Sequence, residues 1–310
     1  MAIFLIRRVI ISIPVLLAVS FIVFFMVHMV PGDPVMLMLG PETNVTGSVI
    51  EQLREEMGFN EPLYIQYSRY MMKLLSGDMG NSIRSRRPVL EEIVIRIPNT
   101  VELALVSMGL AITFGIAMGI VCAVNHNKIT DYVLSVISLL GVSLPNFWFG
   151  LLLMLFFGLY LRWVPVTSGP GTGFRGLILP AVTLALSIQT ATARLTRSGM
   201  LEVMNNDYIR TARSKGVREW IVVIRHALRN SLISVLTVVG VQFGGIMAGT
   251  TIIETVFGRL GIGVLLINAI LEKDMPIVQG VLLMISTVYI SVNFVVEVIY
   301  VWLDPRIRLI

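Results

Sequence analysis

Long apolar runs with almost no charge constrain this chain more than any other feature. The first run, residues 9–30, contains no Asp, Glu, Lys or Arg, and a helix needs about 20 apolar residues to cross the hydrocarbon core of a bilayer. Five further runs are of comparable length: 101–124, 132–161, 177–193, 231–253 and 277–303. We therefore predict an all-α polytopic membrane protein with six transmembrane helices.

The composition excludes other classes of protein. The chain has 310 residues, of which 55% are hydrophobic and 14% charged, whereas a soluble domain is roughly 25% charged. The chain has too few charged residues to cover the surface of a soluble protein of this size. Its apolar content also excludes a disordered or fibrous chain. The single cysteine, Cys122, excludes a disulfide framework. No metal site is expected, because the three histidines lack the spacing of metal ligands.

Basic residues near the ends of the runs predict the orientation. Two arginines precede the first run, Arg306 and Arg308 follow the last, and the connection 198–230 is strongly basic. Cytoplasmic flanks are enriched in Lys and Arg, so six spans put both termini and this connection in the cytoplasm. A seven-span alternative, in which Pro145 divides the third run, would separate the termini. The net charge of +5 indicates contact with anionic lipid or protein, and we expect no nucleic acid partner.

A long polar stretch, residues 31–99, separates the first two runs. Loops longer than about 60 residues cross the membrane largely regardless of charge, so we predict an extracytoplasmic cap. Helices are expected at 49–57 and 63–75, the first because apolar residues recur in it at helical spacing. The chain then divides into residues 1–30 (N-terminus and first span), 31–99 (cap) and 100–310 (core transmembrane domain).

Polar residues inside the runs are candidates for a translocation pathway. Ser143 and Asn146 flank Pro145, which breaks a helix and is tolerated in a membrane where it lines a cavity or is covered by protein. A simple kink is the alternative. Glu254 and Glu297 are ionisable, and we expect a structural hydrogen bond for each, with Glu254 close enough to the outer interface to be solvated.

Small residues at helical spacing predict close packing of helices. Gly115 and Gly119 share one face of the second run, and Gly240 and Gly244 share one face of the fifth. Packing within the chain explains the pattern, and so does a second membrane subunit docked on the fifth span.

The connection 198–230 carries a pattern of two helices separated by a glycine. Asp207 is placed to cap a short helix, Lys215 lies in its last turn, and Gly216 follows as a C′ glycine. A second, amphipathic helix is expected from an apolar stripe formed by Trp220, Ile221, Ile224 and Leu228. Such an element can present a knob to another protein or lie on the membrane and hold anionic lipid.

This segment resembles the coupling-loop signature of ABC importer permeases, most closely the dipeptide/oligopeptide/nickel branch. The matching stretches are 207–216, DYIRTARSKG, and 225–232, RHALRNSL. Other stretches that are similar to family motifs follow in order along the whole chain: Arg7-Arg8, Pro31-Gly32-Asp33-Pro34, Ser143-Leu144-Pro145, Leu179-Pro180, 193–198, Glu254-Thr255-Val256-Phe257 and 304–308.

The general importer signature is matched only in part. It reads Glu-Ala-Ala, three residues and then glycine; Gly216 fits the glycine, but Arg210-Thr211-Ala212 stands in place of Glu-Ala-Ala. A proline that the general pattern has near Arg229 is absent. The peptide branch is similar to this chain at these points, and contacts that depend on the missing glutamate do not carry over.

The resemblance implies a type I ABC importer permease fold in the bacterial plasma (inner) membrane. It implies a heterodimer with a second homologous permease subunit, two cytoplasmic ATPase subunits docked on the coupling helices, and an extracytoplasmic substrate-binding protein. The residues expected to couple to the ATPases are Asp207, Tyr208, Arg210, Thr211, Ala212, Arg213, Lys215 and Gly216. We expect Ala212 to be small so that a partner groove can close over it, and Gly216 to need a conformation that other residues resist.

The chain lacks the Gly-x-x-x-x-Gly-Lys-Ser/Thr phosphate loop. We therefore expect no enzymatic activity and no cofactor on this chain, with ATP and Mg²⁺ bound by the partner ATPases. The expected cargo is a di- or oligopeptide, and nickel or glutathione is the alternative within the branch. An ion-coupled secondary transporter is a different class, and it would show repeated halves, of which none is visible. A membrane enzyme would need a nucleophile–base pair, and Ser143 has no His or Lys nearby in sequence.

Overall fold

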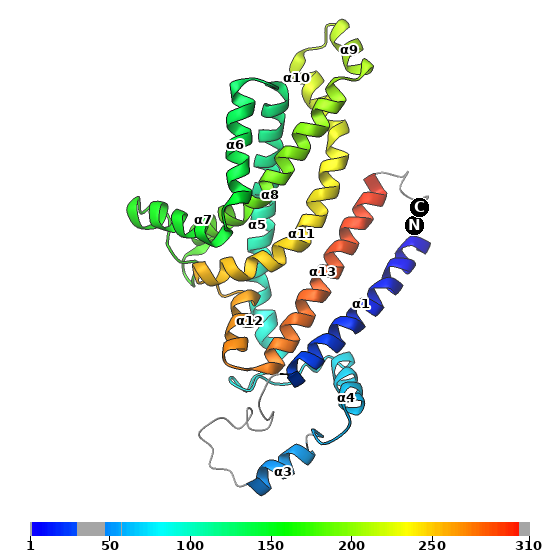
Figure 1. Cartoon of the computed structure of the whole chain (residues 1–310), viewed down its shortest axis with the longest axis vertical. Helices are drawn as coiled ribbons and strands as arrows, with labels where there is room; N and C mark the ends of the chain where they lie inside the picture. The colour runs from blue at the N-terminus through cyan, green and yellow to red at the C-terminus, as the bar shows by residue number, and fades with distance from the viewer. Residues whose placement is uncertain (1, 30–46, 57, 304–310) are drawn as a thin grey trace. The chain divides into compact units, whose positions relative to one another are not determined.

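The computed structural model describes residues 2–29, 47–56 and 58–303, and this part of the chain is helical almost throughout (Figure 1). Within it, the only β-pairing is an isolated bridge between Asn81 and Pro88. The predicted all-α class is therefore confirmed. The motif at 31–34, the cap residues 35–46 and the motif at 304–308 lie outside the described residues.

The described helices follow one another in chain order. Their bounds are α1 (Ala2–Met29), α3 (Gly47–Glu56), α4 (Leu63–Leu75), α5 (Val89–Val124), α6 (Ile129–Ser143), α7 (Asn146–Leu153), the π-helix η1 (Met154–Tyr160), α8 (Gly173–Met204), α9 (Asp207–Ser214), α10 (Glu219–Ile221), the π-helix η2 (Val222–Leu228), α11 (Arg229–Phe257), α12 (Ile262–Leu271) and α13 (Met275–Leu303). Helices α3 and α4 confirm the two helices expected before the second run, apart from residue 57. Helix α12 was not anticipated.

Four helices are long and apolar enough to cross a membrane, at Ile6–Met26, Val89–Val124, Gly173–Met204 and Met275–Val296. A fifth span results if Gly249–Phe257 and Ile262–Leu271 are counted together as one broken helix. The described residues thus form a protein with several spans. The count of six is not confirmed and stays a prediction.

The third expected span, 132–161, is divided into α6, α7 and η1. Helix α6 ends at Ser143, and Pro145 is the N-cap of α7 with φ −59° and ψ 131°. Proline lacks a backbone N–H and disfavours a helical residue before it, so the helix stops instead of bending. Figure 1 shows α7 running across the end of α6. The helix is therefore broken at Pro145 and not simply kinked.

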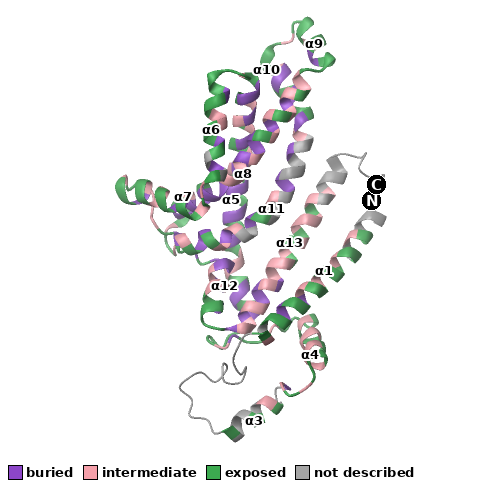
Figure 2. Ribbon diagram, in the orientation of Figure 1, coloured by how far each residue is buried: buried purple, intermediate pink, exposed green. Residues whose placement is uncertain are grey.

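Two compact units make up the chain. The first contains Asn99–Val264 and the segment from Ser291 onward, and the second contains Ala2–Pro98 and Leu265–Ile290. In the first unit, α8 packs against α6, α7 and α11. Figure 2 shows that α8 is largely buried, whereas α7 and α9 are mostly exposed. Helix α8 is therefore the central element of the first unit.

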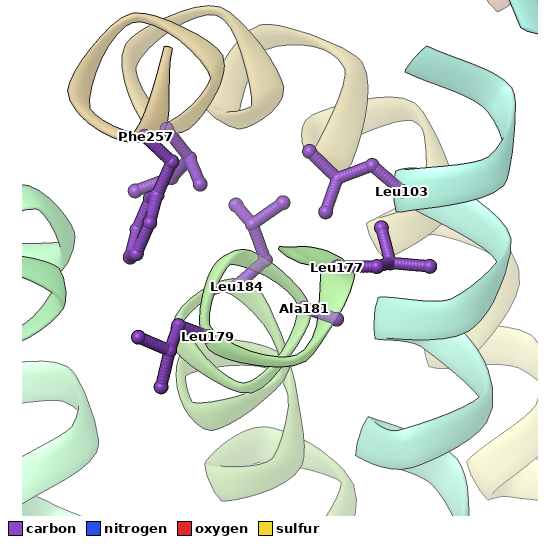
Figure 3. Packing of buried hydrophobic residues seen from close by; sticks show 7 residues of the cluster. Leu103, Leu177, Leu179, Ala181, Leu184 and Phe257 are labelled. Carbon is purple, nitrogen blue, oxygen red and sulfur yellow. The ribbon is translucent and has the colours of Figure 1, made fainter. Parts of the chain in front are cut away.

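An apolar cluster holds α5, α8 and α11 together. Figure 3 shows Leu103 of α5, Leu184 of α8 and Phe257 of α11 directed into a shared interior. All three side chains are at most 3% exposed. In a membrane these contacts gain from close packing more than from exclusion of water.

Helix α5 also contacts α8 through the two glycines predicted to form a packing face. A Cβ on Gly115 would lie 2.7 Å from Cβ of Thr192, and one on Gly119 would lie 2.5 Å from Cβ of Thr196. No side chain fits in that space, so the glycines allow the two backbones to approach. Packing within the chain thus explains this pair.

In the second unit, α1 contacts α4. The loop before α5 contacts the residue that precedes α13. Tyr67 of α4 hydrogen-bonds Ser20 of α1, with 2.8 Å between the two hydroxyl oxygens. Nearer the end of α1, Nε2 of His28 lies 3.1 Å from Oε1 of Gln66. In the loop before α5, Ser82 donates a 2.5 Å hydrogen bond to the buried carboxylate of Asp274. Helix α4 is therefore attached to α1 by side-chain hydrogen bonds.

Candidate coupling helix and its surroundings

Helix α9 begins one residue earlier than its sequence suggested. Asn206 is the N-cap, with an extended backbone at φ −73° and ψ 149°. Asp207, expected as the cap, is instead the first helical residue, and its side chain is 99% exposed. Its carboxylate still lies at the end of the helix where the macrodipole favours negative charge.

The end of α9 is a Schellman motif centred on Gly216. Gly216 has φ +73°, in the left-handed region. Its N–H donates to the carbonyl of Arg213 at 2.9 Å, and the N–H of Val217 donates to the carbonyl of Ala212 at 3.2 Å. These are the two bonds that define the motif. The expectation that Gly216 occupies a conformation other residues resist is confirmed.

One face of α9 is anchored on the interior of its own chain. Ile209 is fully buried in an apolar cluster with Met200 of α8 and Val222 of η2, and Ala212 packs against the same cluster. A larger residue than alanine would have to displace these neighbours. Packing inside the chain therefore explains the small side chain at Ala212, and the partner groove expected from the sequence is not needed for it.

The opposite face of α9 is open and carries both signs of charge. The exposed residues are Asp207, Tyr208, Arg210, Thr211, Arg213, Ser214, Lys215 and Gly216. Two contacts fix this face to the following segment: Asn230 donates to the hydroxyl of Tyr208 at 3.0 Å, and Nη2 of Arg213 donates to Oε1 of Glu219 at 2.6 Å. The hydrogen bond from Arg213 lowers the pKa of Glu219 below its ordinary value, and Glu219 raises the pKa of Arg213.

The segment after Gly216 is helical, as predicted, but it buries a different face. Val222, Val223 and Ala227 are buried, whereas Trp220 is 63% exposed and Ile224 is 46% exposed. Residues 222–228 form the π-helix η2, which has more residues per turn than an α-helix and so changes the phase of the pattern. Of the expected stripe, Trp220 and Ile224 therefore do not pack on the interior of the chain, whereas Leu228 packs against the cluster that contains Ile209.

The three pathway candidates have side-chain contacts of their own. Ser143 is exposed and donates to the carbonyl of Leu139 at 3.0 Å. Asn146 accepts a hydrogen bond from Ser187 of α8 through its side-chain oxygen. Glu254 is fully buried, and its carboxylate accepts from the hydroxyl of Thr100 at 2.5 Å and from the N–H of Gly263 at 2.8 Å. The expected structural bond of Glu254 is confirmed, and its expected solvation is not.

Two charge clusters were not singled out from the sequence. Arg197 of α8 pairs with the buried Asp131 at the start of α6. At the opposite end of the same unit, Arg259 pairs with Glu102 of α5. The sequence does contain a weak signal, since each of the four charged residues lies in or near an apolar run, but the two members of each pair are far apart along the chain.

With this geometry established, the chain can be compared with known proteins. Residues 115–309 match the family described as binding-protein-dependent transport system inner membrane component, and residues 1–104 match the N-terminal part of the same systems. The chain belongs to this family. This permease is also 40% identical over 305 residues to the protein named glutathione transport system permease protein GsiC of Salmonella paratyphi A, with 98% of each chain covered. The identity and coverage are the same for GsiC of Escherichia coli K12.

The fold of the permease is shared with a solved transporter. A structure of the MetNI methionine ABC transporter in inward-facing conformations aligns with a TM-score of 0.58 at 16% sequence identity. The alignment covers 68% of this chain and 95% of the other. At this identity the match shows the fold alone. The chain is therefore a multi-pass inner-membrane permease of an ABC importer, in a family that works with ATPase and substrate-binding partners.

Proposed function

We propose that this permease forms half of the translocation pathway of an ATP-driven importer of short peptides, including peptides such as glutathione. The observation that carries the proposal is α9: a helix whose one face is fixed in the core by Ile209 and whose other face is exposed. A rigid helix can pass on a displacement that a loose loop would absorb. In this role the exposed face of α9 docks in the cytoplasm on an ATPase that supplies the energy.

The remaining partners follow from the same role. A second homologous permease subunit completes a heterodimer, two ATPases bind ATP and Mg²⁺, and a substrate-binding protein delivers the cargo from outside. Both termini lie in the cytoplasm, and the cap, 31–99, faces outward and contacts the binding protein. The chain itself is not an enzyme. The GsiC relatives are named for glutathione, a γ-glutamyl tripeptide, and this supports a peptide cargo in preference to nickel.

The test is uptake by proteoliposomes that contain the permease, its partner permease and the ATPases, with binding protein outside. We expect uptake of Ala-Ala or glutathione that requires ATP. Reversing the charge on the exposed face of α9 by Arg210→Glu should reduce the amount of ATPase that copurifies. Arg175→Glu, at the far end of α8, is the matched control and should have no effect, because Arg175 is exposed and distant from α9 along its unit.

Two results would contradict the proposal. Uptake driven by a proton gradient without nucleotide would favour an ion-coupled transporter. Labelling of residues 207–216 by an impermeant reagent from outside the cell would place α9 on the wrong side of the membrane.

A further inference from the structure

A polar pocket lies in the first unit, near the start of α8 and the end of α11. Figure 1 shows these two helix ends on the side of the unit opposite α9. Its volume is about 390 Å³, and small-molecule pockets are about 300–1,000 Å³. Three segments form it: Asn99 and Glu102 of α5, the glycine-rich loop 168–172 with the first residues of α8, and Arg259 and Leu260 after α11. The coupling mechanism makes no use of this pocket.

Arg259 supplies hydrogen-bond donors to the pocket. Its side chain is 6% exposed, and it donates from Nε to the carbonyl of Asn99 at 3.0 Å, from Nη1 to Oγ of Ser168 at 3.1 Å, and from Nη2 to Oε2 of Glu102 at 2.5 Å. A guanidinium carries five N–H donors. The described residues therefore account for three of them, and two remain for a ligand.

Acceptors lie beside these donors. Glu102 is paired with Arg259, yet its side chain is 53% exposed, so its carboxylate can still accept from a ligand. The carbonyl of Gly169 in the loop already accepts from the hydroxyl of Thr172 at 2.7 Å, so Glu102 is the acceptor offered to a ligand. The N–H of Ser168 donates to the carbonyl of Phe257 at 2.7 Å and holds the start of the loop against α11.

The charge of the pocket points to one class of ligand. Arg259 and Glu102 neutralise each other. A simple anion bound to Arg259 would therefore be repelled by Glu102, and a simple cation bound to Glu102 would be repelled by Arg259. A peptide amide avoids both conflicts, because its carbonyl accepts from Arg259 and its N–H donates to Glu102. Phe174 and Leu260 provide an apolar wall on which a side chain of the peptide can lie.

We propose that this pocket is an entrance subsite that binds the backbone amide of a short peptide as the binding protein releases it. The proposal rests on the proposed function of the chain as a peptide importer. It names the site at which the permease itself first contacts its cargo, and the residues that do so are Arg259 and Glu102.

Protection from labelling tests the site directly. A Cβ on Gly169 has no neighbour within 4 Å, and φ there is not positive, so Gly169→Cys introduces a thiol at the pocket without a clash. Cys122, the one native thiol, is buried and is replaced by serine. In the reconstituted complex, Ala-Ala and the neutral N-acetylalanine methylamide should each slow modification by an impermeant maleimide at least about fivefold, a difference of ~1 kcal/mol.

The controls separate an amide site from a charge site. Acetate and ethylamine should leave the rate at Gly169→Cys unchanged, since acetate has no N–H to donate to Glu102 and ethylamine has no carbonyl to accept from Arg259. The matched residue is Gly47, which is exposed in α3 and also has no neighbour within 4 Å. None of the four compounds should protect Gly47→Cys. Protection by acetate alone or ethylamine alone would overturn the assignment to an amide.

Transport provides the second measurement. Gly169→Phe should fill the pocket and lower uptake of Ala-Ala at least about tenfold. If the wild-type complex imports Ala-Ala but Gly169→Cys is not protected and Gly169→Phe transports normally, the subsite is wrong and the importer stands. If the wild-type complex imports no peptide while binding its ATPases, the proposed function fails first.

Discussion

The guanidinium of Arg197 donates two parallel hydrogen bonds to the carboxylate of Asp131, from Nε to Oδ1 and from Nη2 to Oδ2, each 2.7 Å long. The side chain of Asp131 is 3% exposed and that of Arg197 is 30% exposed. The N–H of Asn127 donates to Asp131 as well, at 3.1 Å. This pair fixes α8, which leads directly into α9, to the start of α6. We expect it to make the base of the coupling helix rigid.

Breaking this pair should lower the free energy of unfolding of the permease. The size of the loss should depend on which of the two charges remains without a partner. Arg197→Met leaves the buried carboxylate of Asp131 without its cation, which costs about 3–5 kcal/mol in comparable sites. Asp131→Asn leaves only the charge of Arg197, whose side chain is 30% exposed, and should cost less. Thermal unfolding of the purified chain in detergent measures both. The double variant should lose less than the sum of the single losses, and equal losses for the two single variants would contradict the argument.

Gly216 offers a test of the coupling helix that involves no side-chain clash. A Cβ there has no neighbour within 4 Å, so the effect of a substitution comes from φ +73° alone. Gly216→Val should strain the Schellman motif by about 1–2 kcal/mol and reduce cargo moved per ATP hydrolysed. Gly216→Asn is the control, since asparagine tolerates the left-handed region. Normal coupling by Gly216→Val in a normally assembled complex would refute the role of this turn.

Close approach of α5 and α8 should make Gly119 intolerant of a methyl group. A Cβ there would lie 2.5 Å from Cβ of Thr196 and 2.7 Å from the carbonyl oxygen of Ala193. Gly119→Ala should therefore cost about 1–3 kcal/mol, as overpacking does. Gly109 of the same helix has no neighbour within 4 Å, and Gly109→Ala should instead stabilise by about 0.4–1 kcal/mol. Melting temperatures that move in the same direction would contradict this contrast.

Acid should loosen the link between α9 and α10. Arg213 lowers the pKa of Glu219, so the link contributes stability above the unfolded-state pKa and loses it as pH falls through the lower folded-state pKa. Because both side chains are substantially exposed, the contribution is about 0.2–1 kcal/mol. The fluorescence of Trp220, with the other three tryptophans replaced by phenylalanine, reports the transition. The midpoint of this transition should lie at a lower pH in the wild-type protein than in Arg213→Gln. Glu219→Gln should abolish the transition.

The sequence by itself determined the membrane class, the positions of most apolar helices and the end of α9. These features depend on neighbours along the chain: twenty apolar residues, a proline or a glycine act locally wherever they stand. The family could also be identified from the sequence, because the 207–216 stretch and the other motifs occur in the same order as in the family. The two alternatives at Pro145 could not be separated in this way, since a proline permits both a kink and a break.

Tertiary structure alone decided which groups meet. Arg197 lies 66 residues from Asp131, and Arg259 lies 157 residues from Glu102, so no spacing rule connects them. The burial of Ala212 against its own core depends on the position of α9, and the face that η2 buries depends on a π-helical turn. Contacts of this kind arise when separate helices pack, and the free energy that selects them is shared among residues that are remote in the chain.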